Sequence, residues 1–155
     1  MIMTFLLRFL LVVLFFPFSA LDKTLNFDGA VGQAQTLIPA RALATLMILA
    51  GLAIEVITPL CILSGIADRA AALVLGLYSI ATAILFKQFW SVPDFWARGP
   101  SKSRDLFWDF LKNLSLAGGI LLLTFGTGPV AVAQFLANPL GSTHPYASHS
   151  ASEAP

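Results

Sequence analysis

Four long apolar segments constrain the fold of this chain more than any other feature of its sequence. They cover approximately residues 3–21, 41–63, 68–90 and 106–126, and each approaches the ~20 residues that a helix needs to cross a ~30 Å hydrocarbon core. The composition agrees, because 57% of the 155 residues are hydrophobic and only 11% are charged, against about 25% charged in soluble domains. The sequence therefore predicts an all-α polytopic membrane protein, an antiparallel bundle of four transmembrane helices in contact with lipid.

The first apolar segment resembles a cleavable signal peptide in its position and in its ending, Phe18-Ser19-Ala20. Three features argue against cleavage: Arg8 lies inside the apolar run, bulky Phe18 occupies the −3 position, and the run exceeds the roughly 7–15 residues of a signal peptide's apolar region. We expect this segment to be retained as a membrane span.

The connections between the segments predict the topology. Residues 64–67 form a short link that makes the second and third spans an antiparallel hairpin. The longer polar connections, residues 22–40 and 91–105, lie on the opposite side and collect most of the Lys and Arg residues. The positive-inside rule then places both long loops in the cytoplasm and both termini outside. We expect residues 1–140 to form the transmembrane domain and the Ser-, Pro- and His-rich residues 141–155 a disordered polar tail.

Glu55 is a lone carboxylate in the apolar stretch LAGLAIEVITPLCILSG, where a charged group costs roughly 2.5–3.5 kcal/mol in lipid unless it is paired. At ~1.5 Å per residue it lies roughly 12 Å from the link end of its helix, and Arg8 lies roughly 9 Å deep on the same side. We therefore predict that Glu55 faces the interior and pairs with Arg8 first, and with Arg69 second or through water. Asp68 is expected to cap the third span. The Glu55–Arg8 pair would either fix the helix register or form a proton or ligand site.

A second polar cluster is expected near the long loops. Asp109, Lys112 and Asn113 share one face of the fourth span through their three- and four-residue spacings, and Lys87 and Trp90 end the third span at the same level. These residues would serve either as interfacial anchors or as part of a quinone slot. The candidates for binding or proton handling are therefore Glu55, Arg8, Arg69, Lys112, Asn113, Asp109, Lys87 and Trp90.

Several classes of chemistry have no support in the sequence. A net charge of +1 without a basic face argues against nucleic acid. The single cysteine, Cys61, allows no intrachain disulfide. No nucleotide, flavin, haem or metal-ligand spacing is present. We expect no metal and no redox cofactor bound by this chain alone, so a stand-alone enzyme is not expected and no catalytic residue is assigned.

A group of short motifs resembles the DoxX family of small four-helix membrane proteins. The motifs are Leu6-Leu7-Arg8, Asp22-Lys23, the stretch 50–65 around Glu55, Phe89-Trp90, and Phe110-Leu111-Lys112-Asn113 followed by Gly118-Gly119. They run in order from about residue 5 to residue 129. The resemblance implies a four-helix transmembrane bundle with polar family positions at Arg8, Lys23, Glu55, Arg69, Lys112 and Asn113. The chain departs from the family at Lys87, where members often have a histidine.

The same resemblance implies a function. It points to a membrane subunit of a quinone-linked oxidoreductase or respiratory complex in the bacterial inner membrane, with quinone as a ligand and with partner subunits that carry the electrons. Two alternatives remain: a non-catalytic accessory or assembly subunit, and a bundle that binds or transports lipids or small molecules. A ligand-binding role needs a cavity that reaches Glu55, whereas a structural role needs Glu55 packed, paired and closed off.

Overall fold

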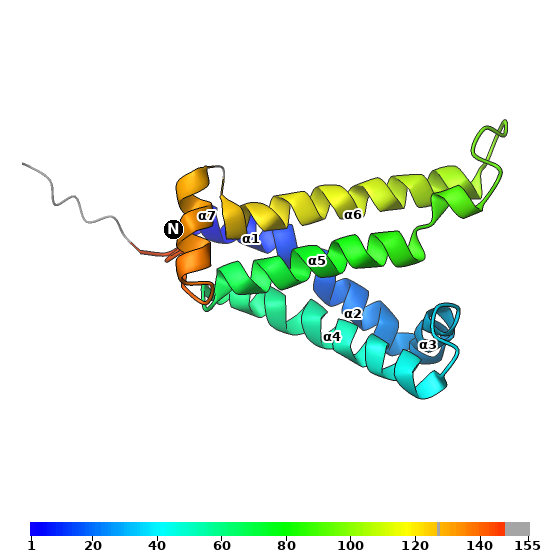
Figure 1. Cartoon of the computed structure of the whole chain (residues 1–155), viewed down its shortest axis with the longest axis horizontal. Helices are drawn as coiled ribbons and strands as arrows, with labels where there is room; N and C mark the ends of the chain where they lie inside the picture. The colour runs from blue at the N-terminus through cyan, green and yellow to red at the C-terminus, as the bar shows by residue number, and fades with distance from the viewer. Residues whose placement is uncertain (127, 148–155) are drawn as a thin grey trace, which may run out of the picture.

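The computed structural model describes residues 1–126 and 128–147, and these residues form helices and no strand (Figure 1). Four stretches are long and apolar enough to cross a membrane, namely Ile2–Leu25, Arg41–Ser64, Asp68–Ser91 and Lys102–Phe125. This confirms the expected all-α fold with four membrane-spanning segments. The elements are α1 (Ile2–Val12), α2 (Phe16–Leu25), α3 (Phe27–Gln35), α4 (Arg41–Ser64), α5 (Asp68–Phe86), the 3-10 turn η1 (Phe89–Ser91), α6 (Lys102–Phe125) and α7 (Pro129–Ala137).

The first span is divided into two helices. α1 ends at Val12 and α2 begins at Phe16, because Pro17 has no N–H to donate to the carbonyl of Val13 and its ring would clash with that carbonyl. α2 then continues to Leu25, four residues beyond the predicted end of the span. The extension places Lys23 in a helix instead of in a loop.

Different segments of the chain lie at the two ends of the bundle (Figure 1). The N-terminus, the turn between α4 and α5 and the short helix α7 lie at one end, here called the link end. α3 and the loop 92–101 lie at the other, here called the long-loop end. Gly65, at φ 77°, ends α4 in the left-handed conformation that glycine adopts without strain. The tight turn that follows makes α4 and α5 the predicted antiparallel hairpin.

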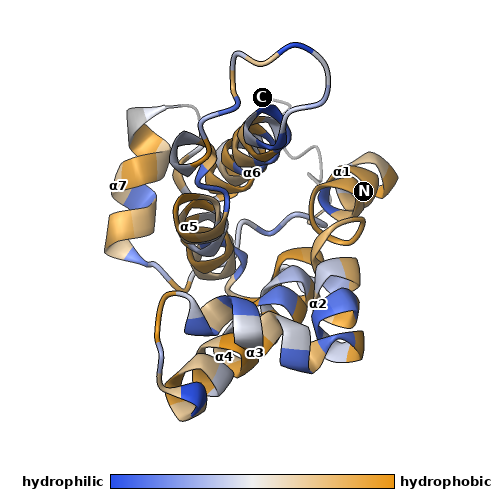
Figure 2. Cartoon of the chain, turned by 90° about the vertical axis from the view of Figure 1, so that its right-hand side faces the viewer, coloured by the Kyte–Doolittle hydropathy of each residue, from blue (hydrophilic) through white to orange (hydrophobic). Residues whose placement is uncertain are grey.

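The bundle separates into two groups of helices toward the long-loop end. α2 and α3 pack on α4, while α5 packs on α6, and Figure 2 shows the two groups from that end. The groups join nearer the link end, where α1 contacts both α4 and α6. A buried core fills that junction, with Val12, Phe16, Ile62, Leu75 and Ile120 all nearly or completely inaccessible.

The outer faces of the long helices are apolar. Leu46, Leu60 and Leu77 are 61%, 61% and 54% exposed, and an apolar surface of this extent on a helical bundle requires lipid as its solvent. The long helices thus contact lipid along their length.

The described chain beyond α6 continues as the short helix α7 (Pro129–Ala137) and then runs along the link end. α7 lies across the link end, where its Phe135 packs edge-on against Phe125 with ring centroids 5.6 Å apart. Of the tail that we expected to be disordered, residues 141–147 follow α7 and bind the bundle through Thr143 and Tyr146. Residues 148–155 lie outside the described residues.

Asp94 ties the long loop to the start of α6. Its carboxylate accepts hydrogen bonds from the backbone N–H groups of Lys102 at 2.8 Å and Ser103 at 2.9 Å. These bonds, that from Ser103 above all, hold the pKa of Asp94 below its ordinary value of 3.8. A carboxyl group whose folded pKa is depressed stabilises the fold above its unfolded pKa, and this contribution is lost as the pH falls through the folded pKa.

We therefore expect the amides of Lys102 and Ser103 to lose protection when the pH drops below the ordinary pKa of Asp94, 3.8. Hydrogen exchange followed between pH 5 and pH 3, after correction for intrinsic rates, measures this loss. Asp94→Asn should expose the same amides at both pH values. Equal protection of wild type and variant at pH 5 would show that the carboxylate does not hold the loop.

Candidate functional site

Glu55 is paired with Lys23 of α2. Its Oε1 atom lies 2.5 Å from Lys23 Nζ and accepts further hydrogen bonds from Ser19 Oγ at 3.1 Å and Tyr78 Oη at 3.0 Å. Glu55 is only 2% exposed. It faces the bundle interior, but the expected pairing with Arg8 is wrong, and so is the expected second pairing with Arg69.

Arg8 and Glu55 do not meet at their matching depths because the first span is not one straight helix. The break before Pro17 redirects α2 along α4, which α2 contacts extensively. The Lys23 side chain points back toward the start of α2, as helical side chains do, and its Nζ also donates to Ser19 Oγ at 2.9 Å. The four-residue spacing of Ser19 and Lys23 at the end of an apolar run was the available sequence signal.

Tyr78 reaches Glu55 because Gly51 leaves room for its ring. A Cβ atom on Gly51 would lie 2.9 Å from the Tyr78 hydroxyl oxygen, closer than real Cβ contacts allow. Tyr78 could not be predicted as a partner of Glu55, because neither its spacing nor its surroundings in the sequence distinguish it from an ordinary helix residue.

This geometry predicts that Gly51→Ala lowers the free energy of unfolding when residue 78 is tyrosine and raises it when residue 78 is phenylalanine. In the wild-type background the new methyl displaces the Tyr78 hydroxyl and costs a hydrogen bond to a charged group, about 1.5–3 kcal/mol, which outweighs the gain of up to ~1 kcal/mol in helix propensity. In a Tyr78→Phe background the clashing oxygen is gone, so Gly51→Ala should stabilise the protein. Unfolding free energies of the four proteins measure the difference, and equal effects in both backgrounds would contradict the contact.

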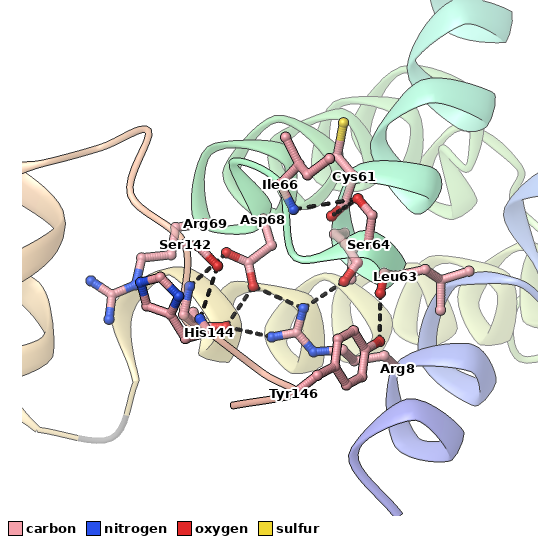
Figure 3. A network of polar contacts seen from close by, with 12 residues as sticks. Arg8, Cys61, Leu63, Ser64, Ile66, Asp68, Arg69, Ser142, His144 and Tyr146 are labelled. Atoms are coloured by element: carbon pink, nitrogen blue, oxygen red, sulfur yellow. Dashed lines mark hydrogen bonds and ion pairs between the residues drawn. The ribbon is translucent and has the colours of Figure 1, made fainter. Parts of the chain in front are cut away.

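Arg8 belongs to a separate buried network at the link end (Figure 3). Its Nη1 lies 2.8 Å from Asp68 Oδ2 and donates to the Ile62 carbonyl at 2.5 Å. Its Nη2 donates to Thr143 Oγ1 at 2.7 Å, and Thr143 donates to Asp68 through both its N–H and its hydroxyl. Asp68 therefore does not cap α5 through its side chain, contrary to expectation. It is completely buried and joins α1, α5 and the C-terminal segment.

Arg69 turns toward α7 instead of the bundle interior. Its guanidinium Nη2 lies 3.4 Å from Gln134 Oε1, while its backbone carbonyl accepts a hydrogen bond from Thr124 Oγ1 at 2.8 Å. Arg69 thus contributes to the attachment of α7 and α6 at the link end.

A cavity of about 630 Å³ lies between the two groups of helices. Glu55, Lys23, Ser19 and Tyr78 are among the residues that line it. The other Glu55 oxygen, Oε2, is buried and has no hydrogen-bond partner among the described residues. A buried carboxylate oxygen without a partner is costly. Glu55 lines the cavity, so a ligand or water that reached this oxygen from the cavity would be stabilised.

The predicted polar cluster on α6 also lines this cavity. Asp109 accepts hydrogen bonds from Lys87, which follows α5, at 3.1 Å and from Lys112 at 3.4 Å. Asn113 completes the polar wall. The structure thus places four of the predicted residues, Lys87, Asp109, Lys112 and Asn113, around the same cavity as Glu55.

Trp90 lies outside this cavity. It borders a separate hollow of about 410 Å³ with Phe89, Phe95 and Trp96, and its ring packs edge-on against Phe110 with centroids 5.9 Å apart. Arg8 and Arg69 are likewise absent from the cavity wall. Three of the eight predicted residues therefore do not share the site of Glu55.

Comparison with known proteins identifies the family. A family model described as DoxX matches residues 3–88. The chain belongs to the DoxX family. The chain is also 32% identical over 123 residues to the inner membrane protein YphA of Escherichia coli (strain K12), an alignment that covers 79% of this chain and 81% of YphA. No solved structure matches the chain. The family assignment, the apolar surface and the four long helices together make this DoxX protein an integral membrane protein.

The DoxX match covers one part of the cavity wall and leaves out another. Ser19, Lys23, Glu55 and Tyr78 all lie within residues 3–88. The residues contributed by α6, such as Asp109, lie beyond the matched region. The Glu55 end of the cavity is therefore formed by the part of the chain that carries the family signature.

Proposed function

We propose that this DoxX protein is a membrane subunit that binds the head group of a membrane-soluble quinone in the cavity beside Glu55. The quinone site would serve a larger oxidoreductase or respiratory complex, whose other subunits carry the electrons. One observation carries the proposal: the buried, unpartnered Glu55 Oε2 beside a cavity of about 630 Å³. That volume falls within the roughly 300–1,000 Å³ of small-molecule sites.

The groups around Glu55 suit a head group that both donates and accepts hydrogen bonds. Glu55 Oε2 is covered by neighbouring atoms, and a rotation of the carboxylate toward the cavity would let it accept a bond from a quinol hydroxyl. Lys23 Nζ has three N–H donors and uses two of them, on Ser19 and Glu55, so the third can donate to a quinone carbonyl. The apolar part of the cavity wall, which includes Phe15, Phe16, Met47 and Leu85, supplies the hydrophobic contacts of a ring and its attached chain.

The same proposal includes the location of the protein. YphA is named as an inner membrane protein, and we place this chain in the bacterial inner membrane as well. Because Arg41, Arg98, Lys102 and Arg104 lie at the long-loop end, the positive-inside rule favours a cytoplasmic position for that end and an external position for both termini.

An accessory subunit without a ligand is the main alternative. It would use buried charges only to set helix register, as the fully paired Arg8–Asp68 network does. Glu55 differs from that network in having an unpartnered oxygen and a cavity beside it. This difference favours a binding role at Glu55 and a structural role at Arg8. Transport of a small molecule would require the cavity to open to both sides in turn.

Purification of the tagged protein from its own membrane in mild detergent tests the proposal. Mass spectrometry of the sample reports both the extracted quinones and the co-purifying subunits. We expect quinone to be extracted from the wild-type sample and not from the Glu55→Gln sample. A flavin- or haem-containing subunit should co-purify with both proteins. A complex recovered intact without quinone, unchanged by the substitution, would leave the protein an accessory subunit.

A further inference from the structure

We infer that Glu55 has aqueous access from the long-loop end only, so that water and protons reach the Glu55–Lys23 pair from a single side of the membrane. This inference concerns the cavity itself. It does not depend on the identity of the ligand, and it would hold equally for a quinone or for another small molecule.

Between Glu55 and the long-loop end, polar side chains line the cavity wall over several helix turns. Glu55 follows Arg41, the long-loop end of α4, by fourteen residues, or ~21 Å along the axis. Polar side chains line the cavity at successive levels over this distance. On the α2–α3 side these are Asp22, Asn26 and Gln33, and on the α5–α6 side Ser79, Thr82, Lys87, Asp109, Lys112 and Asn113.

The charged groups along this wall are themselves partly solvated. The side chains of Lys23, Lys87, Asp109 and Lys112 are 25%, 33%, 42% and 74% exposed. Ionised groups need water or partners at every level, so a cavity lined in this way is stable when it is filled with water.

The link end is closed by two successive layers. The first is the apolar core, in which Phe16, Ile62 and Leu75 are at most 1% exposed. The second is the Arg8–Asp68 pair, whose side chains are 6% and 0% exposed and which Thr143 covers with two hydrogen bonds to Asp68 (Figure 3). Only nine residues of α4, or ~14 Å, separate Glu55 from Ser64 at this end. The path from Glu55 to the link end is thus shorter than the path to the long-loop end, but it is blocked by packed side chains.

Cysteine accessibility tests this inference without any assay of activity. In a Cys61→Ala background, single cysteines replace Thr82 and Ser19 on the cavity wall, and Leu77, which is 54% exposed on the lipid-facing surface of α5, serves as the matched control. Trp96→Cys and Ile66→Cys, at exposed positions of 90% and 70%, mark the long-loop side and the link side. A membrane-impermeant maleimide is added to vesicles of each orientation.

We expect the cysteines at positions 82 and 19 to react when the maleimide is on the long-loop side, where it labels Trp96→Cys. They should be protected when it is on the link side, where it labels Ile66→Cys. Leu77→Cys should react from neither side. The inference would be overturned if either cavity cysteine reacted from the link side, which Ile66→Cys marks. It would also be overturned if position 82 reacted and position 19 did not. If Ser19→Cys fails to accumulate, Ser79→Cys, at another position of the cavity wall, takes its place. Labelling from the expected side in a protein that binds no quinone would reject only the proposed ligand.

Discussion

Arg8→Met should lower the free energy of unfolding by about 3–5 kcal/mol, the usual cost of removing one partner from a buried ion pair. The substitution leaves the Asp68 carboxylate, which is 0% exposed, without the guanidinium group that pairs with it. It also removes the hydrogen bonds from Arg8 to the Ile62 carbonyl and to Thr143. Methionine retains most of the volume of arginine, so packing loss contributes little.

Two comparisons isolate the cause of this loss. Adding Asp68→Asn to Arg8→Met removes the unpaired charge and should recover a large part of the lost stability. Arg41→Met breaks an ion pair whose two side chains are 70% and 86% exposed, and exposed pairs contribute ~0–1 kcal/mol. Unfolding titrations in mixed micelles measure all of these variants. An Arg8→Met protein as stable as Arg41→Met would contradict the role assigned to the network.

Lys23→Met is the second substitution with a large expected effect. It leaves the Glu55 carboxylate, 2% exposed, with the hydroxyl groups of Ser19 and Tyr78 as its remaining donors among the described residues. We expect a loss of about 3 kcal/mol, at the lower end of the range for a broken buried pair, because those two hydrogen bonds remain.

Glu55→Gln should cost less than Lys23→Met. The Lys23 side chain is 25% exposed into the cavity, where water can solvate its ammonium group. The double variant Lys23→Met/Glu55→Gln should be more stable than Lys23→Met alone, because no unpaired charge remains. The same unfolding titrations give the coupling between the two positions. Additive effects would mean that the pair contributes nothing as a pair.

The fold could be predicted because its main determinant is local. Each span is a run of about twenty apolar residues, and a helix is the expected structure for such a run at membrane depth. The short link at residues 64–67 similarly required an antiparallel hairpin. The break in the first span was missed, although Pro17 carried the signal, and so was α7, whose nine residues are too few for a span.

The site could be predicted only in part, because it depends on which helices meet. The three- and four-residue spacing of Asp109, Lys112 and Asn113 correctly indicated a common face, since that relation lies within one helix. The partners of Glu55 and Arg8 come from other elements. Spacing cannot show that α2 tilts against α4, or that Thr143 from the far end of the chain covers Asp68.

The most direct test of the proposed function is a titration of the purified protein in lipid nanodiscs with a short-chain quinone. We expect saturable binding by wild type, and at least tenfold weaker binding by Glu55→Gln, which corresponds to ~1.4 kcal/mol. Asp28→Asn, a change at a carboxylate that is 86% exposed and does not itself line the cavity, should bind as wild type does. Equal binding by wild type and Glu55→Gln, or no saturable binding by either, would contradict a quinone site at Glu55.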